Sequence, residues 1–133
     1  MITDDKAMHM LGVARRMREY ALEDGADEKR AEEAFVVGWL HDIGYEFTSK
    51  ANHENYGADI LERMNFPYAD EIRHHAEPGD GEMLGWLIKA DMTVDHQGKF
   101  CTLEERLNGI KERYGEGETY RKCVKIAECV NSR

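Results

Sequence analysis

Two adjacent polar residues, His41 and Asp42, follow an apolar stretch of the sequence that runs from Val36 to Leu40. A buried polar group without a partner costs about 1–3 kcal/mol, so both side chains need one. A metal ion satisfies both, because a neutral imidazole offers a lone pair and a carboxylate offers charge. This mixture of nitrogen and oxygen donors suits Mn, Fe, Co, Ni or Zn better than Mg alone. The pair therefore indicates a site for a divalent transition metal.

Other histidines lie on further segments of the chain, together with Asp91. His9 lies in the first segment with helical periodicity, and Asp91 follows an apolar turn in a later one. His53 stands at the start of a third such segment. His74 and His75 are neighbours at the end of a fourth.

The segments that must position these residues are helical, because their apolar residues recur with the period of an α-helix. No run of alternating strand residues appears, so the sequence predicts an all-α, compact single-domain bundle of about six or seven helices over residues 1–133. Asp4 or Asp5 is expected to cap the first helix, Asp27 the second, and Thr102 with Glu105 forms a capping box for the sixth. The expected helices span about 4–23, 27–44, 52–64, 67–75, 83–96 and 102–114, with a last helix that ends near 130.

The composition limits the possible partners. The chain has 133 residues and a formal net charge of −9, which argues against a general nucleic-acid binder. Its longest nearly apolar stretch, Ala34 to Leu40, is shorter than the roughly 20 residues that cross a bilayer, so no membrane partner is expected. No basic segment followed by an apolar one begins the sequence, and we expect a cytoplasmic location.

The order of these residues resembles a known family. The segment GWLHDIG at 38–44 is similar to the signature of the HD-domain superfamily of metal-dependent phosphohydrolases. That family's pattern has a His in the first helix, the His-Asp pair at the end of a later helix and a distant Asp. His9, His41, Asp42 and Asp91 match it in order, and the resemblance covers about residues 7 to 110.

Two further segments resemble the two-metal, YqeK-type branch, which hydrolyses symmetrical dinucleoside polyphosphates at a di-iron site. His53 lies in NHENYGA at 52–58, and His75, rather than His74, matches the ligand in IRHHA at 72–76. The resemblance implies one or two divalent transition metal ions. His9, His41, Asp42 and Asp91 would hold the first and Asp42, His53 and His75 the second, with Asp42 as the bridge. The chain departs from that branch at Tyr45, where a lysine is usual, and at His74, where an aromatic residue is usual. The resemblance therefore does not fix the identity of the substrate.

The resemblance implies hydrolysis of a nucleotide or another small phosphorylated metabolite, with a metal-bound water as the nucleophile. Asp42 and Glu46 are the candidate catalytic carboxylates, and Asp95 is a candidate supporting group. The candidate contacts to substrate phosphate are Lys50, Arg73, Lys89 and Lys99, whereas His96 is expected at the surface. Two alternatives remain: a non-catalytic, metal-stabilised regulatory or ligand-binding domain, and a di-iron oxygenase of the same fold. The oligomeric state is not predicted.

Overall fold

The computed structural model describes residues 2–46, 53–75 and 81–131. Within these ranges the chain forms helices and turns, with one isolated bridge between Val94 and Phe100. The predicted all-α fold of six or seven helices is confirmed. The helices are α1 (Asp4–Glu23), α2 (Glu28–Leu40), α3 (His53–Arg63), α4 (Ala69–Arg73), α5 (Glu82–Asp91), α6 (Leu103–Tyr114) and α7 (Glu118–Asn131), and a short 3-10 helix, η1 (Ile43–Glu46), follows α2.

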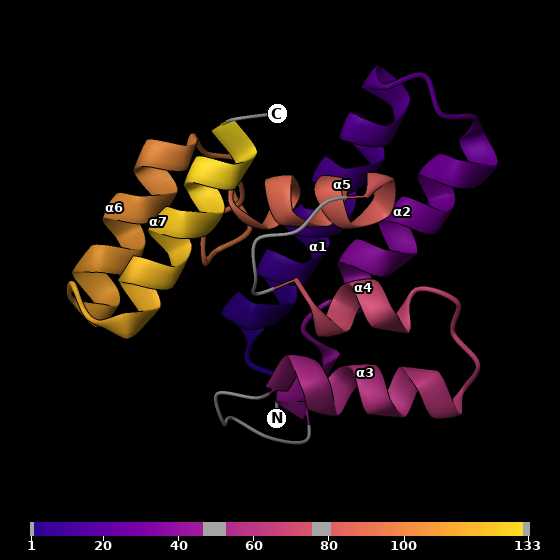
Figure 1. The fold of residues 1–133 in the computed structure, drawn as a ribbon, viewed down its shortest axis with the longest axis horizontal. Coiled ribbons are helices and arrows are strands. Elements are labelled where there is room, and N and C mark those ends of the chain that lie inside the picture. The colour runs from indigo at the N-terminus through magenta and orange to yellow at the C-terminus, as the bar shows by residue number, and fades with distance from the viewer. Residues whose placement is uncertain (1, 47–52, 76–80, 132–133) are drawn as a thin grey trace.

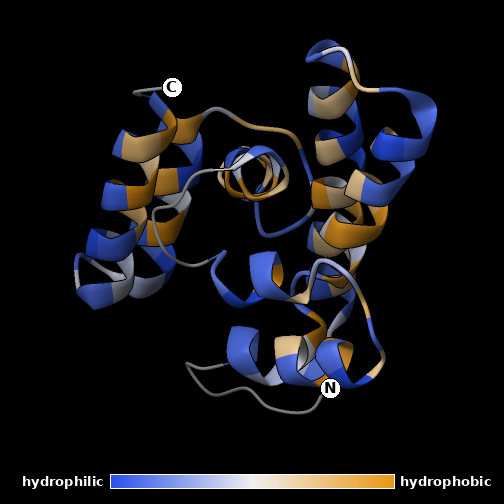
Figure 2. Ribbon diagram, turned by 45° about the vertical axis from the view of Figure 1, so that its right-hand side comes forward, coloured by the Kyte–Doolittle hydropathy of each residue, from blue (hydrophilic) through white to orange (hydrophobic). Residues whose placement is uncertain are grey.

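Helix α5 lies at the centre of the molecule, between the α1–α2 pair and the α6–α7 hairpin (Figure 1). Figure 2 shows it nearly end-on, with apolar residues around much of its circumference. One side of α5, which includes Trp86 and Leu87, packs into the main core with α1 and α2. Its other side, which includes Ile88, packs against Ile126 and Ala127 of α7. A short helix with two apolar faces thus holds the two halves of the fold together.

The capping residues at the helix starts agree with the prediction for α2 and α6 and differ from it for α1. The Asp27 side chain accepts the N–H of Arg30 at the start of α2, as predicted. Thr102 and Glu105 form the predicted reciprocal capping box at the start of α6. The prediction of Asp4 or Asp5 as the cap of α1 is wrong, because the hydroxyl of Thr3 accepts the N–H of Lys6. The two acids lie in the first turn instead, where the helix dipole favours negative charge.

Two helices end earlier than the sequence predicted. Helix α2 ends at Leu40 rather than near Gly44, because the chain tightens there into η1. Helix α5 ends at Asp91 rather than near His96. Beyond it the Thr93 hydroxyl donates to the main-chain oxygen of Lys89, and the chain turns back on itself. Helix α4 is also shorter than its predicted span of 67–75, since it runs only from Ala69 to Arg73. These early ends leave several of the candidate ligands at or just beyond helix termini.

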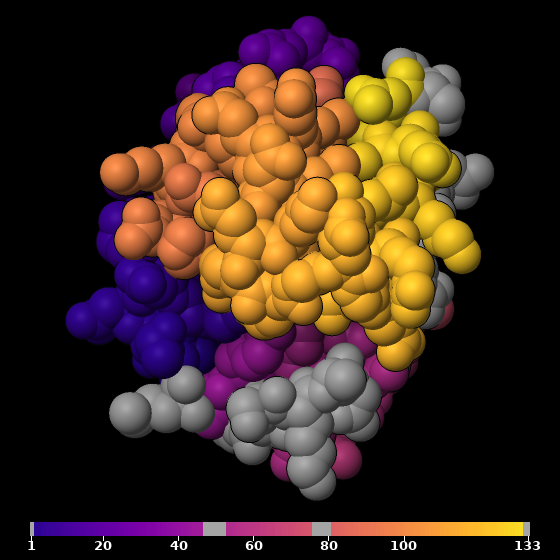
Figure 3. All heavy atoms as spheres, turned by 90° about the vertical axis from the view of Figure 1, so that its left-hand side faces the viewer, coloured from indigo at the N-terminus to yellow at the C-terminus, as the bar shows by residue number. Residues whose placement is uncertain are grey.

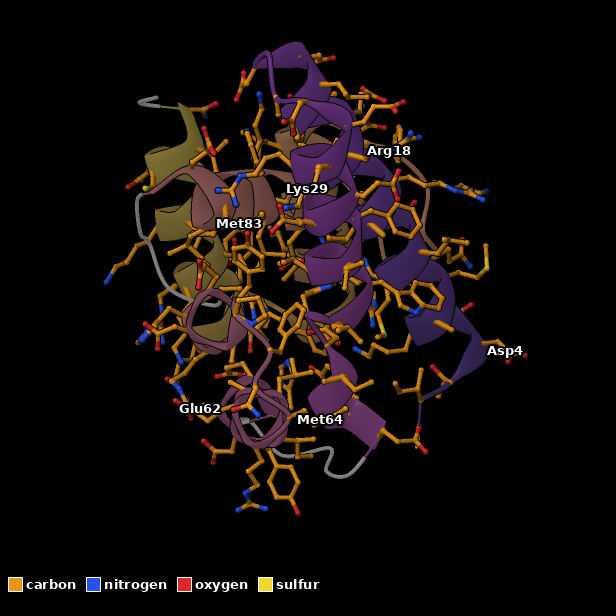
Figure 4. All side chains as sticks on the ribbon, turned by 90° about the vertical axis from the view of Figure 1, so that its right-hand side faces the viewer. Asp4, Arg18, Lys29, Glu62, Met64 and Met83 are labelled. Atoms are coloured by element: carbon orange, nitrogen blue, oxygen red, sulfur yellow. The ribbon has the colours of Figure 1, made fainter. Side chains whose placement is uncertain are left out.

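The outer surface of the α1–α2 pair carries charged side chains together with exposed apolar ones such as Leu22 and Trp39. Arg18 of α1, which is labelled in Figure 4, forms an ion pair with Glu32 of α2 across this surface, with 3.2 Å between Nε and Oε1. Such exposed pairs contribute little to stability, so the two helices are held mainly by their buried contact. No helix in the described ranges is long and apolar enough to cross a membrane.

The central place of α5 predicts a strong effect from one core substitution. Leu87 is fully buried, at 0% exposure, whereas Leu22 at the end of α1 is 44% exposed. Leu87→Ala removes the same atoms as Leu22→Ala but leaves a cavity, so it should lower the free energy of unfolding by about 2–5 kcal/mol. Urea unfolding followed by circular dichroism measures both variants. Equal losses from the two would contradict this account of the core.

Candidate metal centre

The structure brings six of the sequence candidates together beside α5. His9 comes from the second turn of α1, and the others lie at or just beyond the ends of helices. His41 is almost completely buried, at 1% exposure, and His9, Asp42 and His75 are also buried. Helix ends are the natural source of such groups, because their side chains can leave the helix axis and converge. The six residues of the cluster are His9, His41, Asp42, His53, His75 and Asp91.

The carboxylate of Asp42 lies between two sets of histidines. Its Oδ2 is 3.2 Å from Nε2 of His41 and 3.9 Å from Nε2 of His9. Its Oδ1 is 3.1 Å from Nε2 of His53 and 3.4 Å from Nε2 of His75. Each oxygen therefore faces a different pair of imidazoles, and this is the geometry that a bridging carboxylate needs.

Asp91 belongs to the first of these sets. Its Oδ1 is 2.8 Å from Nε2 of His9 and 3.4 Å from Nε2 of His41. Three donor atoms, one each from His9, His41 and Asp91, lie within 4.8 Å of one another, and so do three from His41, Asp42 and His75. His41 takes part in both groups, whereas the sequence had assigned it to the first metal alone. His53 approaches the second group through Asp42.

The ring orientation of three histidines is set by main-chain oxygens. Nδ1–H of His41 donates to the carbonyl of Gly38 at 2.7 Å, and that of His75 donates to the carbonyl of Ile72 at 2.6 Å. Nδ1–H of His9 donates to the carbonyl of Asp95 at 2.8 Å. A carbonyl can only accept, so these contacts place a proton on Nδ1 and turn Nε2 toward the centre of the cluster. Metal-binding histidines are commonly oriented in this way.

The loop after α5 carries the carbonyl that orients His9. The Asp95 carboxylate accepts the N–H groups of Gln97 and Lys99, both at 2.9 Å, which closes the loop on itself. Gly98 has a positive φ of 85°, and a Cβ at this position would collide with the main chain of Met8. Glycine thus lets the loop reach α1 one residue before His9. Asp95 supports the cluster as the sequence suggested, through its backbone oxygen.

The cluster is strongly coupled electrostatically. Burial lowers the pKa of His41, but the carboxylates of Asp42 and Asp91 outweigh it and raise that pKa to about 10. Burial raises the pKa of both carboxyls, yet the neighbouring imidazoles hold each pKa well below its usual range. Asp42 also raises the pKa of His75 against the effect of burial. The buried carboxylate of Asp42 and the partly buried one of Asp91 therefore favour positive charge in the space between these rings.

The donor set fits a divalent transition metal. Nε2 of His41 is buried, and no residue in the described part of the chain gives it a hydrogen bond. Such an orphaned nitrogen costs free energy unless a proton donor or a cation meets it. Neutral imidazoles together with carboxylates are ligands that such metals accept. The assignment of these six residues as metal ligands remains a prediction.

The cluster opens into a cleft of about 600 Å³. Residues of α6 and α7, among them Arg106, Arg113 and Lys122, line its other side. Figure 3 shows this hairpin across the face of the molecule, with the start of α1 and the α3 region below it. Arg106 reaches the cluster itself, because its Nε donates to the main-chain oxygen of Asp91 at 3.2 Å.

Four of the other candidates are not brought to this cleft by the structure. The Glu46 carboxylate is exposed and accepts the N–H of Ile2 at 3.2 Å. Arg73 forms ion pairs with two acids of α3 instead. The Lys89 ammonium lies over the ring of Tyr20, 4.2 Å from its centre. Lys99 is exposed and does not line the cleft either.

Three more residues named in the sequence analysis need a separate account. Lys50 lies outside the described residues. His74 is half exposed and stands 4.0 Å from the carboxylate of Asp70, so His75 is the member of the pair in the cluster. The expectation of a surface position for His96 is wrong, because it is half-buried and lines the cleft.

Several residues of the cleft escaped the sequence analysis. Lys6 lines the cleft, and its position three residues before His9 placed it on the same face of α1, a signal that periodicity could have supplied. Glu54 follows His53 directly, with its Oε2 3.1 Å from Nδ1 of that ring. Arg106 carried no local signal, because only the packing of α6 brings it to Asp91.

Comparison with known proteins gave one match. The family model described as the HD domain matches residues 7–130, which is most of the chain. Neither the curated proteins nor the solved structures contain a match to this chain.

The neighbouring histidines 74 and 75 supply a matched test of the cluster. His75→Ala should lower the affinity for Co²⁺ more than tenfold, because it removes a buried nitrogen beside Asp42. His74→Ala should leave that affinity within about twofold of the wild type. Isothermal titration calorimetry on metal-free protein measures both. A larger loss from His74→Ala than from His75→Ala would contradict the placement of His75 in the ligand set.

Proposed function

Because the chain belongs to the HD-domain family, we propose that it is a metal-dependent phosphohydrolase that acts on a nucleotide or another small phosphorylated metabolite. Proteins of this family are generally metal-dependent hydrolases. The observation that carries the proposal is the Asp42 carboxylate, with a different pair of imidazoles at each oxygen and a cleft of about 600 Å³ beside it. A volume of this size suits a small-molecule ligand.

The residues that would hold metal fall into two sets that share Asp42. His9, His41 and Asp91 would serve one ion, and His53 and His75 the other. A bound pair of divalent ions supplies Lewis acidity and lowers the pKa of a coordinated water. The surrounding protein keeps the donors in place, because main-chain carbonyls fix three of the four rings.

Cationic side chains in the cleft would bind the phosphate. The whole chain carries −9, so affinity for an anion must come from local positive charge. Arg106 lies beside Asp91 with only 15% of its side chain exposed, and its bond to the Asp91 carbonyl holds the guanidinium near the cluster. Lys6 lines the cleft from α1. These two replace Arg73 and Lys89 as the proposed phosphate contacts.

The YqeK-type resemblance supports a narrower substrate class, the symmetrical dinucleoside polyphosphates. Such a substrate carries several negative charges, and the cleft also offers Arg113 and Lys122 farther from the cluster. We propose a small phosphorylated molecule as the partner, rather than a nucleic-acid polymer or a membrane, on the grounds of the acidic composition. A cytoplasmic location is part of the same proposal.

Product release from a panel of phosphate compounds tests the function. The panel holds nucleotides, dinucleoside polyphosphates and phosphomonoesters, each given to protein loaded with Fe²⁺, Mn²⁺ or Co²⁺. We expect turnover of at least one class by the wild type and a loss of more than about 100-fold in Asp42→Ala, since this variant deletes the shared ligand. Phosphate assay and chromatography of the nucleotide products provide the measurement.

Other results would favour the alternatives. Tight nucleotide binding without product, together with a large fall in melting temperature on chelation, would indicate a non-catalytic binding domain. Oxygen uptake that depends on substrate and on iron would indicate an oxygenase. Equal turnover by the wild type and Asp42→Ala would contradict the proposed metal chemistry.

A further inference from the structure

The ring of Tyr45 lies between two groups of the cleft. The imidazole of His53 is stacked on it, with 3.8 Å between the ring centres and 21° between the planes. The ammonium of Lys6 lies over the same ring, also 3.8 Å from its centre. Two groups at this distance cannot share one face, so Tyr45 is sandwiched between them. The three side chains come from α1, η1 and α3.

The orientation of the His53 ring depends on its stacking contact with Tyr45, whereas main-chain carbonyls orient the other three histidines of the cluster. His9, His41 and His75 each donate Nδ1–H to a main-chain carbonyl, which the fold holds in place. Nδ1 of His53 instead faces the Glu54 side chain, at 3.1 Å from Oε2. A side-chain carboxylate on the neighbouring residue restrains a ring less firmly than a main-chain group does. The flat face of Tyr45 is the second restraint on its plane.

The position of Tyr45 is itself tied to the cluster. Its N–H donates to the main-chain oxygen of Asp42 at 3.0 Å, within the turn that begins η1. Gly44 precedes it, and a Cβ there would collide with the main-chain oxygen of His53. The close approach of these two segments brings the Tyr45 ring directly onto the imidazole. One short turn thus carries both Asp42 and the residue that orients a partner of Asp42.

Lys6 is a cation available to the cleft. It lines the cleft and is half-buried, and no residue in the described part of the chain forms an ion pair with its ammonium. A cation held over an aromatic face keeps most of its attraction for an anion, because the ring provides only a weak counter-charge. Its side chain points from the same face of α1 as His9. The cleft therefore presents Lys6 beside the second set of histidines.

We propose that Tyr45 is a positioning residue with two functions. One face sets the plane of the His53 ring, so that Nε2 meets the second metal beside Asp42. The other face holds the Lys6 ammonium in the cleft, where it binds a phosphate oxygen of the substrate. The inference rests on the proposed function, since it gives Tyr45 and Lys6 their parts in that same site.

Metal titration tests the first function. Metal-free wild type, Tyr45→Ala and Tyr45→Phe are titrated with Co²⁺, and calorimetry and the visible absorption of bound cobalt report each ion separately. We expect two ions in the wild type and an affinity for one of them that falls about 10–100-fold in Tyr45→Ala. Tyr45→Phe should restore it, because the aromatic face is retained. If Tyr45→Ala fails to fold, Tyr45→Leu removes the aromatic face with less loss of volume and carries the same expectation.

Binding of inorganic phosphate to the cobalt-loaded protein tests the second function. Lys6→Gln should keep both cobalt ions and weaken phosphate binding about tenfold, as expected for loss of one charge-assisted hydrogen bond. Lys29→Gln is the matched control, because Lys29 is an exposed lysine of α2 and does not line the cleft (Figure 4). It should bind both cobalt and phosphate as the wild type does.

The outcomes separate this inference from the proposed function. Two ions bound with unchanged affinity by Tyr45→Ala would overturn the role of Tyr45 and leave the metal centre intact. Unchanged phosphate binding by Lys6→Gln would overturn the role of Lys6. A wild type that binds fewer than two cobalt ions would instead overturn the two-metal proposal, and the assignment of Tyr45 with it.

Discussion

The buried carboxylate of Asp42 is the constraint on which the rest of the site depends. It is only 6% exposed, and each of its oxygens faces two imidazoles. A carboxylate removed from water costs several kcal/mol unless positive charge and hydrogen bonds compensate it. The fold meets this need by placing four histidines around Asp42, with Asp91 beside two of them. Such a density of donors around one buried acid is costly to assemble for stability alone and suits a cation well.

The donors are positioned by the points at which helices begin and end. α2 stops just before His41, α5 stops at Asp91, and α3 starts at His53, so three elements direct side chains to one point. α5 is held on both sides by apolar contacts, and this places Asp91 between the α1–α2 pair and the α6–α7 hairpin. The hairpin in turn covers the cluster and supplies Arg106. The central helix thus supplies Asp91 to the cluster and supports the hairpin that forms the facing wall of the cleft.

Much of this arrangement could be predicted from local sequence, and the remainder could not. Helical periodicity and the capping residues Asp27 and Thr102 predicted the fold class, and the resemblance to the HD-domain superfamily predicted which six residues would lie together. The sequence placed the ends of α2 and α5 too late. A 3-10 helix follows α2, and the loop after α5 contacts His9 of α1, and helical periodicity reveals neither feature. The phosphate contacts were misjudged for the same reason. Arg73 is paired with acids of α3, and Arg106 reaches the site only through long-range packing.

An anomalous-difference map from crystals grown with Co²⁺ would test the shared role of Asp42 most directly. Data collected at the cobalt absorption edge locate each ion without reference to activity or substrate. We predict two peaks, one at each oxygen of the Asp42 carboxylate. One should lie against Nε2 of His9 and His41, and the other against Nε2 of His53 and His75. A single peak that does not touch Asp42, or density only at other acidic residues, would contradict the account.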